Sequence, residues 1–512
     1  MRFIIFGLGR EGKSSYHFLR QIFDDVEIIL TDDRDLDLLS RDWKSILAQD
    51  PLSSFATTKH LPISALTEAI LVVAPGIAPH HQLLKQASSM IPITTNTQLF
   101  FETVLPDRAK HSLIKAHLPK LKKQPLVIGV TGTKGKSTTA HAIHHILDTA
   151  GFPCLLGGNI GLPPLDLIES IREQSDQSQN QQIAVVLELS SHQLSRLNIS
   201  PQIAVIQAIT PEHLDYYTDF DSYAAAKSQI TAFQQPEDTI IYYLDNQQSR
   251  KVAAASKGEQ IPFGLNSSTM LAKPDSISSR SLDTQIEDES SSGLRPVCSL
   301  ANQQIIYQGQ PVISLNQLQI KGEHNSLNLM PAIIIAHLLH ISSGQISAAL
   351  SSLKPLPHRL EQVANIDGVI YINDSLSTTP EATIAAIQSF PDQPIILIAG
   401  GFDRGLNFQN LAKVIRQSSV KTVLLLPDTG QKIKALIETQ LDRSARSVTP
   451  PKVVLFDSLK DAVTQAKQLA EPGDVVLLSP ASASFNQFRD YAQRGETFKK
   501  LVKNHYPQKF LT

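Results

Sequence analysis

Cysteine and tryptophan are both scarce in this chain. Two cysteines, Cys154 and Cys298, and one tryptophan occur in 512 residues. The two thiols lie far apart in the sequence and neither has partners at metal-ligand spacing, so the pattern excludes a disulfide framework and a cysteine-based zinc site. Such usage is typical of a reducing cytosol, and we expect both thiols to be inert.

A dominant charge and a long hydrophobic run are also missing. The chain carries 46 basic and 48 acidic residues, which gives a formal net charge of -2 and excludes a global basic surface for nucleic acid. No apolar run has the length that spans a bilayer, and the amino-terminal residues are typical of a strand entering a glycine turn rather than a signal peptide. We therefore expect a soluble, cytoplasmic monomer, without nucleic-acid partners or membrane insertion.

Short apolar runs alternate with helical patterns through most of the chain, which predicts parallel sheets flanked by helices. A polar, lysine-rich stretch at 107–123 separates the first group of runs from the second, and a third group follows Pro355-Leu356-Pro357. We expect an α/β protein of three domains: a Rossmann-like domain at 1–106, a central P-loop domain at 107–355 and a second Rossmann-like domain at 356–512. Residues 266–304, rich in serine and charge, predict a mobile insertion in the central domain.

The most informative motif is Gly129-Val130-Thr131-Gly132-Thr133-Lys134-Gly135-Lys136-Ser137-Thr138, a glycine-rich turn between an apolar strand and a helix that begins near Ser137. In such a turn, backbone N–H groups contact phosphate oxygens, a lysine neutralises them and a hydroxyl can ligate Mg²⁺. Lys136 and Ser137 are the candidates for the last two roles. A nucleoside triphosphate is the expected ligand, although the close glycine spacing and the extra Lys134 depart from the commonest P-loop.

A second glycine turn, Gly7-Leu8-Gly9-Arg10-Glu11-Gly12, follows the first apolar run, and the next run ends at Asp32 and Asp33. This is the pattern of a dinucleotide fold, in which an acidic residue holds the ribose. The domain is short for both halves of such a fold. We therefore favour a nucleoside diphosphate at the helix amino terminus, with NAD binding and a purely structural turn as alternatives.

Polar side chains also follow two apolar runs of the central domain. Glu188 lies at the end of one run, where a charge is costly unless it meets a cation, and His213 follows the next run. Because the P-loop belongs to the same predicted sheet, Glu188 and His213 are candidates for a Mg²⁺-assisted phosphoryl site. Lys227 lies on a helix face of small residues, and this position alone indicates only a surface charge.

Taken in order, these segments resemble the motifs of the Mur ligases over nearly the whole chain. The resemblance rests on both glycine turns, on the Glu188, His213 and Lys227 segments, and on Gly157-Gly158-Asn159-Ile160-Gly161, Gly322-Glu323-His324-Asn325, Leu356-Pro357-His358-Arg359, Asn373-Asp374-Ser375 and Ser479-Pro480-Ala481-Ser482-Ala483-Ser484. It implies three domains that hold a UDP-sugar, ATP with Mg²⁺, and an amino acid. It also implies amide-bond formation through an acyl phosphate in peptidoglycan precursor synthesis, with UDP-N-acetylmuramoyl-L-alanine and glutamate as substrates.

The resemblance implies a role for each matching residue. The catalytic residues would be Lys136, His213 and Lys227, and the metal ligands Ser137, Glu188, His213 and carbamylated Lys227. ATP would be bound by Gly132, Thr133, Lys134, Gly135, Lys136, Ser137, Thr138, Asn325, Asn328, Arg359 and Asp374. The UDP-sugar would be bound by Gly9, Arg10, Glu11, Asp32, Asp33, Arg34 and Asn159, and glutamate by Thr378, Arg404, Ser484, Phe485 and Tyr491.

The predicted amino-acid pocket departs from the family pattern. Leu376 follows Asn-Asp-Ser where many members have lysine, and Arg404 replaces another usual lysine. D-Glutamate is the expected amino acid, and a related ligase that adds L-glutamate is the alternative. A folylpolyglutamate synthase shares the P-loop but lacks this amino-terminal UDP domain. A more distant alternative, based on residues 7–33, is an NAD-dependent oxidoreductase with a P-loop module.

Overall fold

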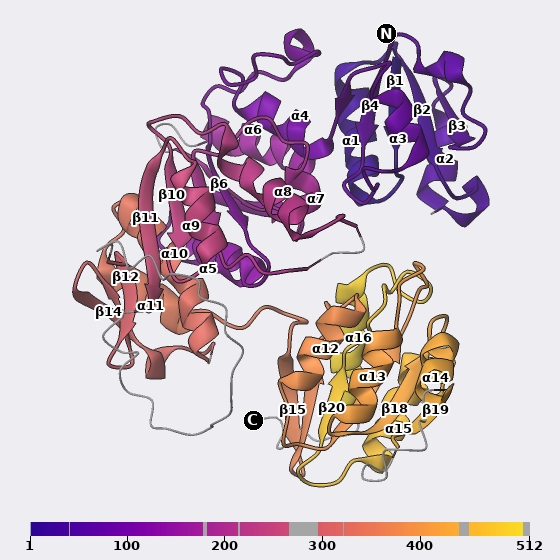
Figure 1. Ribbon diagram of the computed structural model, residues 1–512, viewed down its shortest axis with the longest axis vertical. Coiled ribbons are helices and arrows are strands. Elements are labelled where there is room, and N and C mark those ends of the chain that lie inside the picture. The colour runs from indigo at the N-terminus through magenta and orange to yellow at the C-terminus, as the bar shows by residue number, and fades with distance from the viewer. Residues whose placement is uncertain are drawn as a thin grey trace, which may run out of the picture. The chain divides into compact units, whose positions relative to one another are not determined.

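The computed structural model describes residues 2–39, 41–177, 182–212, 216–265, 295–320, 322–439 and 450–504. The chain forms two compact units, Met1–Lys354 and Pro355–Thr512 (Figure 1). Within the described residues lie three sheets of five, nine and six strands, each mostly parallel and combined with helices. The α/β fold class predicted from the sequence is confirmed. No helix within the described ranges is both long and apolar enough to cross a membrane.

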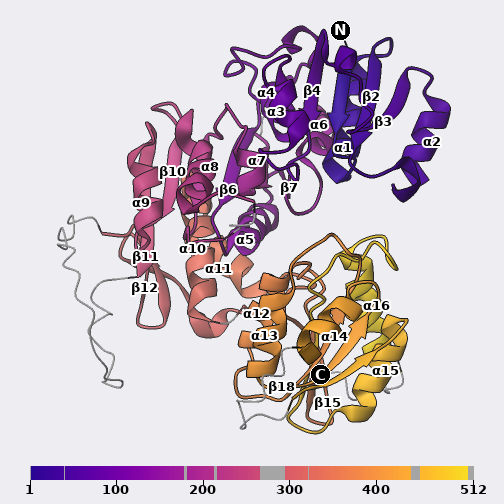
Figure 2. The same ribbon diagram turned by 45° about the vertical axis from the view of Figure 1, so that its right-hand side comes forward.

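The five-stranded sheet has the order β3-β2-β1-β4-β5. Its strands are β1 (Arg2–Phe6), β2 (Glu27–Asp32), β3 (Ser53–Thr57), β4 (Ala69–Val73) and β5 (Ile93–Thr94), and its helices are α1 (Arg10–Ile22), α2 (Arg41–Gln49), α3 (Gln82–Ala87) and α4 (Asn96–Val104). The parallel register places Phe6 beside Thr31 and Val73. The glycine turn after β1 therefore lies at the same edge as Asp32 and the turn after β4. Figure 2 labels β2, β3 and β4 of this sheet together with α1 and α2.

The nine-stranded sheet has the order β14-β13-β12-β11-β10-β9-β6-β8-β7. Its strands are β6 (Leu126–Thr131), β7 (Cys154–Gly158), β8 (Ala184–Glu188), β9 (Ile203–Ile206), β10 (Thr239–Tyr243), β11 (Glu259–Leu265), β12 (Cys298–Ala301), β13 (Gln304–Tyr307) and β14 (Gln310–Ser314). Strand β6 pairs with β8 through Val130 and Glu188, and with β9 through Thr131 and Ile206. The P-loop and Glu188 therefore lie at neighbouring carboxyl ends.

Helices cover both faces of this sheet. They are α5 (Lys136–Thr149), α6 (Ile168–Gln177), α7 (Ser191–Leu194), α8 (Phe220–Ala232), α9 (Gln247–Ala254), α10 (Glu323–Leu338) and α11 (Ser343–Ser352). Helices α5, α10 and α11 share one buried cluster with the sheet, and α6, α7, α8 and α9 belong to the other. The helix that follows the P-loop is thus packed against α10, which comes from much later in the chain.

The insertion predicted at 266–304 is wrong at its carboxyl end. Residues 266–294 lie outside the described residues, but Cys298–Ala301 forms β12, which pairs with β11 and β13. Cys298 and Ile305 are fully buried in the core of the sheet. The strand was missed because it has only four residues and follows a serine-rich segment, so the sequence contains no long apolar run there.

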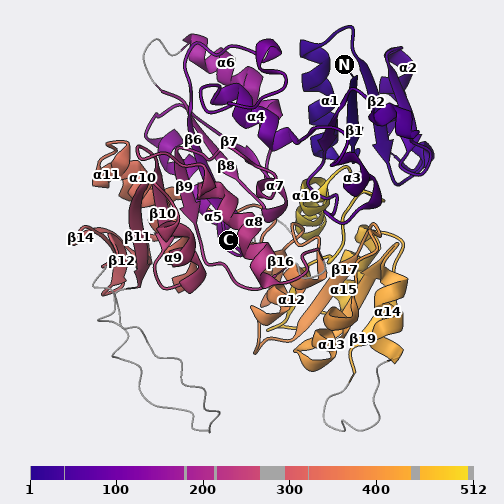
Figure 3. The same ribbon diagram turned by 45° about the horizontal axis from the view of Figure 1, so that its top comes forward.

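The second unit is built on the six-stranded sheet, in the order β15-β16-β20-β17-β18-β19 (Figure 3). Its strands are β15 (Glu361–Ile366), β16 (Val369–Asn373), β17 (Ile395–Gly400), β18 (Val420–Leu426), β19 (Lys452–Leu455) and β20 (Val475–Leu478). One face is covered by α12 (Pro380–Gln388), α13 (Gln409–Gln417) and α14 (Gly430–Thr439), the other by α15 (Leu459–Leu469) and α16 (Tyr491–Lys503). Asn373, Gly400 and Leu478 end adjacent parallel strands, so the turns that follow them share one edge.

Candidate nucleotide and substrate sites

The glycine-rich turn lies between β6 and α5, and its backbone shape requires glycine. Gly132 has φ of +145° and Gly135 of +86°, a range that side chains rarely adopt. A Cβ atom on Gly135 would lie 2.1 Å from the Oδ1 atom of Asn328, and one on Gly132 would lie 2.5 Å from the Cβ atom of Gln207. Helix α5 begins at the next residue, so the free amide groups of its first turn adjoin the loop, as an anion site requires.

Hydrogen bonds join the loop to the segment that follows β9 and hold the Lys136 side chain. The Thr133 hydroxyl accepts from the Thr210 amide at 2.9 Å, and Lys136 Nζ donates to the Thr133 carbonyl at 2.8 Å. Ser137 is buried at the start of α5, whereas Lys134 is exposed. Lys136 therefore holds its ammonium group against the turn.

Helix α10 brings the two predicted asparagines to the same place. The Thr139 hydroxyl donates to the Asn328 carbonyl at 2.8 Å across a sequence separation of 189 residues. Asn328 Nδ2 lies 3.4 Å from Asn325 Oδ1, and the Asn328 amide borders Gly135. The structure thus places both asparagines beside the phosphate loop, and their contacts with ATP stay a prediction.

Two charged side chains are buried beside the loop. Glu188 is 1% exposed, and its Oε1 atom accepts from Asn159 Nδ2 at 3.0 Å. Its Oε2 atom is shielded and has no hydrogen-bond donor among the described residues. Lys227, also 1% exposed, donates to the Gly132 carbonyl at 2.8 Å, with Nζ 4.8 Å from the centroid of the Tyr223 ring.

These two groups fit the predicted metal site. A buried carboxylate oxygen without a donor is suited to a cation. Burial lowers the pKa of Lys227 well below its usual 10.5, nearby Lys136 lowers it further, and the glutamates Glu212 and Glu188 act in the opposite direction. A lowered pKa favours the neutral amine, which is the form that carbon dioxide converts to an anionic carbamate.

The remaining part of the metal prediction is not described. His213 lies outside the described residues. Among the residues that the structure does place, no group of three His, Cys, Asp or Glu side chains could hold a metal ion. Mg²⁺ binding by Ser137, Glu188, His213 and carbamylated Lys227 therefore stays a prediction.

The amino-terminal glycine turn has the shape of a second phosphate cradle. Gly7 has φ of +93°, and a Cβ atom on Gly12 would lie 2.2 Å from the Gly7 carbonyl oxygen, so α1 starts directly against the turn. Asp32 accepts from the Leu8 amide at 2.9 Å and from Arg34 Nε and Nη2 at 2.8 and 3.0 Å. Burial raises the pKa of Asp32, but these hydrogen bonds outweigh it and the pKa lies below its usual value.

An ionised Asp32 therefore stiffens the turn and orients Arg34. The neighbouring Asp33 accepts from the Thr58 hydroxyl at 2.6 Å, and its Oδ1 atom lies 3.1 Å from His81 Nε2. Both carboxylates are predicted from the sequence to bind the UDP-sugar. That assignment stays a prediction, and the structure adds that each carboxylate also organises protein groups.

Contacts within the first unit join this turn to the edge of the nine-stranded sheet. Arg10 donates to the Gly161 carbonyl, and the Glu11 Oε1 atom accepts from Gln193 Nε2 at 2.8 Å. Gln193 belongs to the capping box of α7, which follows Glu188. Gln193 is not among the residues predicted from the sequence, because the Ser190-x-x-Gln spacing indicates a helix start but not this contact.

In the second unit, Asp374 joins the ends of two strands. It is 2% exposed, and its Oδ1 and Oδ2 atoms accept from the Leu360 amide at 3.1 Å and the Ser479 hydroxyl at 2.7 Å. Burial raises its pKa to about 6, against the hydrogen bonds and the nearby Arg359. Asp374 and Arg359 thus lie close together, as predicted for one ligand, although their contacts with ATP are untested.

Two arginines lie near each other at the edge predicted to bind glutamate. Arg404 Nη2 donates to the Thr378 carbonyl at 2.7 Å. Arg494, on α16, is 1% exposed and donates to Ser375 Oγ and O and to the Ser482 carbonyl, each at 3.0 Å. Burial lowers the pKa of Arg494 to about 9, and Arg404 contributes to the shift.

Within the described residues, neither guanidinium forms an ion pair with a carboxylate. Two adjacent cations without a counter-anion fit a site for an anionic ligand. Of the other predicted glutamate residues, Ser484 is buried, Phe485 is 57% exposed, and the Tyr491 carbonyl accepts from the Ser375 hydroxyl. Arg494 is not among the residues predicted from the sequence, because an arginine on a helix carries no local signal of burial.

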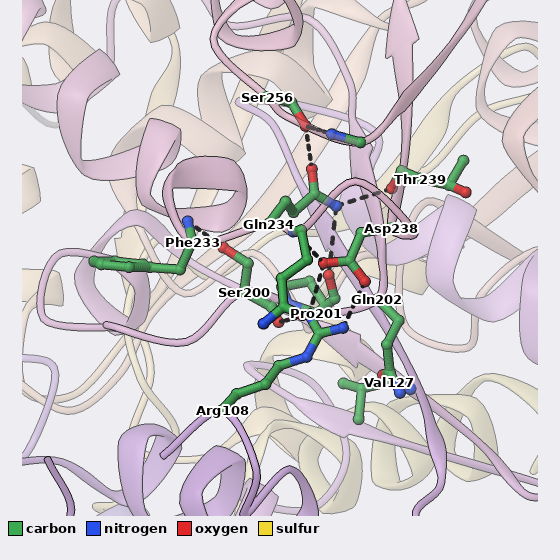
Figure 4. Close-up of polar contacts among 12 residues, drawn as sticks. Arg108, Val127, Ser200, Pro201, Gln202, Phe233, Gln234, Asp238, Thr239 and Ser256 are labelled. Carbon is green, nitrogen blue, oxygen red and sulfur yellow. Dashed lines mark hydrogen bonds and ion pairs between the residues drawn. The ribbon is translucent and has the colours of Figure 1, made fainter. Parts of the chain in front are cut away.

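A cavity of about 430 Å³ lies near the amino ends of β9 and β10, whereas the P-loop follows the carboxyl end of β6. Gln98, Glu102, Arg108 and Phe233 are among its lining residues. Figure 4 shows the adjoining network, in which Arg108 donates two hydrogen bonds of 2.7 Å to Asp238. The cavity belongs to none of the predicted sites, and the ion pair anchors the chain segment that follows α4.

A glycine cradle with a lysine, a buried hydroxyl and a buried acid at the carboxyl edge of a parallel sheet defines a P-loop nucleotide-binding protein. The Mur ligase middle domain model matches residues 130–336, and the Mur ligase, glutamate ligase domain model matches residues 358–482. The chain belongs to the Mur ligase family. It is therefore an ATP-dependent amide-bond ligase, which sets aside the oxidoreductase alternative.

Individual relatives agree with this assignment. The UDP-N-acetylmuramoylalanine–D-glutamate ligase of Natranaerobius thermophilus is 31% identical over 507 residues, covering 98% of this chain and 97% of that protein. The ligase of the same name from Acetivibrio thermocellus is 34% identical over 380 residues, covering 73% and 74%. The solved UDP-N-acetylmuramate-alanine ligase of Thermotoga maritima shares the fold, with a TM-score of 0.52, 14% identity, and coverage of 98% of this chain and 100% of that chain.

Proposed function

We propose that this protein joins D-glutamate to UDP-N-acetylmuramoyl-L-alanine at the expense of ATP, in the cytoplasmic synthesis of peptidoglycan precursors. The choice of substrates follows the relatives named above, one of which is similar over 98% of the chain. The observation that carries the ligase chemistry is the phosphate loop lying against buried Lys227, beside Glu188 with its donor-free oxygen atom.

The reaction requires activation because a carboxylate is a poor electrophile. The alanyl carboxylate of the UDP-sugar attacks the γ-phosphorus of ATP, which releases ADP and leaves an acyl phosphate. The amine of glutamate then attacks the acyl carbon, inorganic phosphate leaves, and the amine loses a proton as the amide forms. Both steps concentrate negative charge on phosphoryl oxygens, so positioning and electrostatic stabilisation supply most of the catalysis.

Each group of residues has a part in this scheme. The loop amides and Lys136 hold the phosphates of ATP, with Asn325 and Asn328 beside them. Ser137, Glu188, His213 and carbamylated Lys227 would hold Mg²⁺, which supplies further neutralisation of the phosphates when bound. The turn before α1 holds the diphosphate of the UDP-sugar.

The second unit supplies the site for the amino acid. Arg404 and Arg494 supply positive charge for the glutamate carboxylates, because no protein carboxylate in the described residues occupies them. The L-glutamate ligase is the second candidate. It is favoured by Asp403-Arg404-Gly405 and Ser377-Thr378-Thr379-Pro380, two segments that resemble the related ligase that adds L-glutamate.

A direct test offers D-glutamate and L-glutamate separately with ATP, Mg²⁺ and UDP-N-acetylmuramoyl-L-alanine. We expect phosphate release only when both substrates are present, together with a product whose mass includes one glutamate and whose hydrolysate contains the D-enantiomer. Incorporation of L-glutamate alone would establish the second candidate. Phosphate release that ignores the UDP-sugar would contradict the proposal.

A further inference from the structure

A carboxylic acid lies in the turn to which the diphosphate of the UDP-sugar is assigned. Glu11 is the second residue of α1, so its charge competes with the ligand for the free amide groups of the helix amino terminus. Its Oε2 atom is shielded from solvent and has no hydrogen-bond donor among the described residues, whereas its Oε1 atom accepts from Gln193. An ionised carboxylate in this position is therefore poorly compensated.

The surroundings of Glu11 hold it near the balance between its two protonation states. Burial is the largest influence and raises the pKa of Glu11 to about 7. The hydrogen bond from Gln193 on α7 and the charge of Arg10 on α1 lower the pKa, and the charge of Asp166, in the short helix Pro164–Leu167, raises it. A small change in nearby charge is enough to move Glu11 from the ionised to the neutral form at physiological pH.

A bound diphosphate is such a change, because it brings negative charge to the same helix terminus. A neutral Glu11 would remove the repulsion and leave the amide groups to the phosphates. We propose that Glu11 takes up a proton when the UDP-sugar binds, and that it acts as a positioning residue whose neutral form admits the diphosphate. The proposal rests on the proposed function, since it requires the UDP-sugar at this turn.

The sign of the effect follows from linkage. The pKa of Glu11 is higher in the complex than in the free protein, so binding consumes a proton wherever the free protein is ionised. Below pH 6, Glu11 is already neutral and little uptake is expected. Above pH 7, the dissociation constant should rise by up to about tenfold per pH unit until the pKa of the complex is reached.

The test is calorimetric titration of the full chain with UDP-N-acetylmuramoyl-L-alanine at pH 6, 7 and 8, each in two buffers of different ionisation enthalpy. The buffer dependence of the heat counts the protons exchanged. We expect uptake approaching about one proton per substrate at pH 8 and little at pH 6. The isosteric variant Glu11→Gln should bind without this uptake and with a dissociation constant that changes little with pH.

The variant Glu102→Gln is the matched control. Glu102 is a buried acid of the first unit whose two oxygen atoms both have donors: Oε1 accepts from Gln98 at 2.9 Å and Oε2 from Ser112 at 2.7 Å. It should retain the proton uptake of the unmodified protein. At pH 8, where the terminal phosphate of UDP is already ionised, UDP alone should also cause uptake, because the effect is assigned to the diphosphate.

Four results would overturn the proposal: binding at pH 8 without proton uptake, uptake that persists in Glu11→Gln, uptake lost equally in Glu102→Gln, or uptake with the full substrate but none with bound UDP. Failure to bind UDP-N-acetylmuramoyl-L-alanine at every pH would instead overturn the proposed function and this proposal with it. The two failures are distinguishable, because binding is measured separately from the proton count.

Discussion

Replacing Gly135 by alanine tests whether the phosphate loop depends on its backbone shape and on its contact with α10. At Gly135, φ is +86° and an added Cβ atom would lie 2.1 Å from Asn328 Oδ1. Gly151, which follows α5, has φ of +76° but no atom within 4 Å of the added Cβ atom. The two positions share the backbone strain and differ in the collision, so Gly151→Ala is the matched control.

The expected magnitudes follow from these two contributions. An alanine in the left-handed region costs about 1–2 kcal/mol at either position. At Gly135, Asn328 must also move away, since ordinary contact begins at 3.4 Å. Forcing its side chain off a rotamer adds about 0.5–1.5 kcal/mol. We expect a loss of about 1–2 kcal/mol for Gly151→Ala and of about 1.5–3.5 kcal/mol for Gly135→Ala.

Nucleotide affinity separates the two variants more clearly than stability does. Titration with a non-hydrolysable ATP analogue should show binding at least about tenfold weaker in Gly135→Ala, because the displaced asparagine borders the loop. The nucleotide affinity of Gly151→Ala should stay within about twofold of that of the unmodified protein. In an Asn328→Ala background the collision is absent, so Gly135→Ala should cost only the free energy of the backbone strain. Equal losses in both backgrounds, or an equally weakened Gly151→Ala, would refute the reasoning.

Three further predictions concern single side chains. Lys136→Ala should lower kcat/KM by about 10²–10³-fold in a phosphate-release assay, because the ammonium group held on the loop neutralises phosphate charge. Replacing the exposed Lys134 by alanine should lower kcat/KM by less than about tenfold, and similar losses of kcat/KM in the two variants would contradict these roles. Arg404→Leu should raise KM for glutamate at least about tenfold with KM for ATP unchanged, and an equal rise in both would place Arg404 outside the amino-acid pocket. Tyr216→Phe removes a hydroxyl that donates to the Ile77 carbonyl at 3.0 Å. The free energy of unfolding of the first unit should fall by about 1 kcal/mol and its Tm by a few degrees. An unchanged Tm would show that this hydrogen bond does not contribute to stability.

The features predicted correctly from sequence are those with local physical causes. The P-loop needs positive φ at Gly132 and Gly135, which only glycine adopts readily, and a helix that starts at Lys136. Alternating apolar runs and helical periods are equally local, so the α/β class could be predicted. β12 was missed for the converse reason: Cys298–Ala301 has only four residues and is too short to stand out without its partner strands.

The sequence by itself determined the fold class, the phosphate loop and the order of the family motifs. Tertiary structure alone decided that Asn328 borders Gly135, that Glu11 meets Gln193, and that Arg494 is buried near Arg404. Each of these contacts joins residues far apart in the chain, and each depends on strand register and helix packing rather than on local pattern. Burial, which raises the pKa of Glu11 and lowers that of Lys227, arises only from that packing.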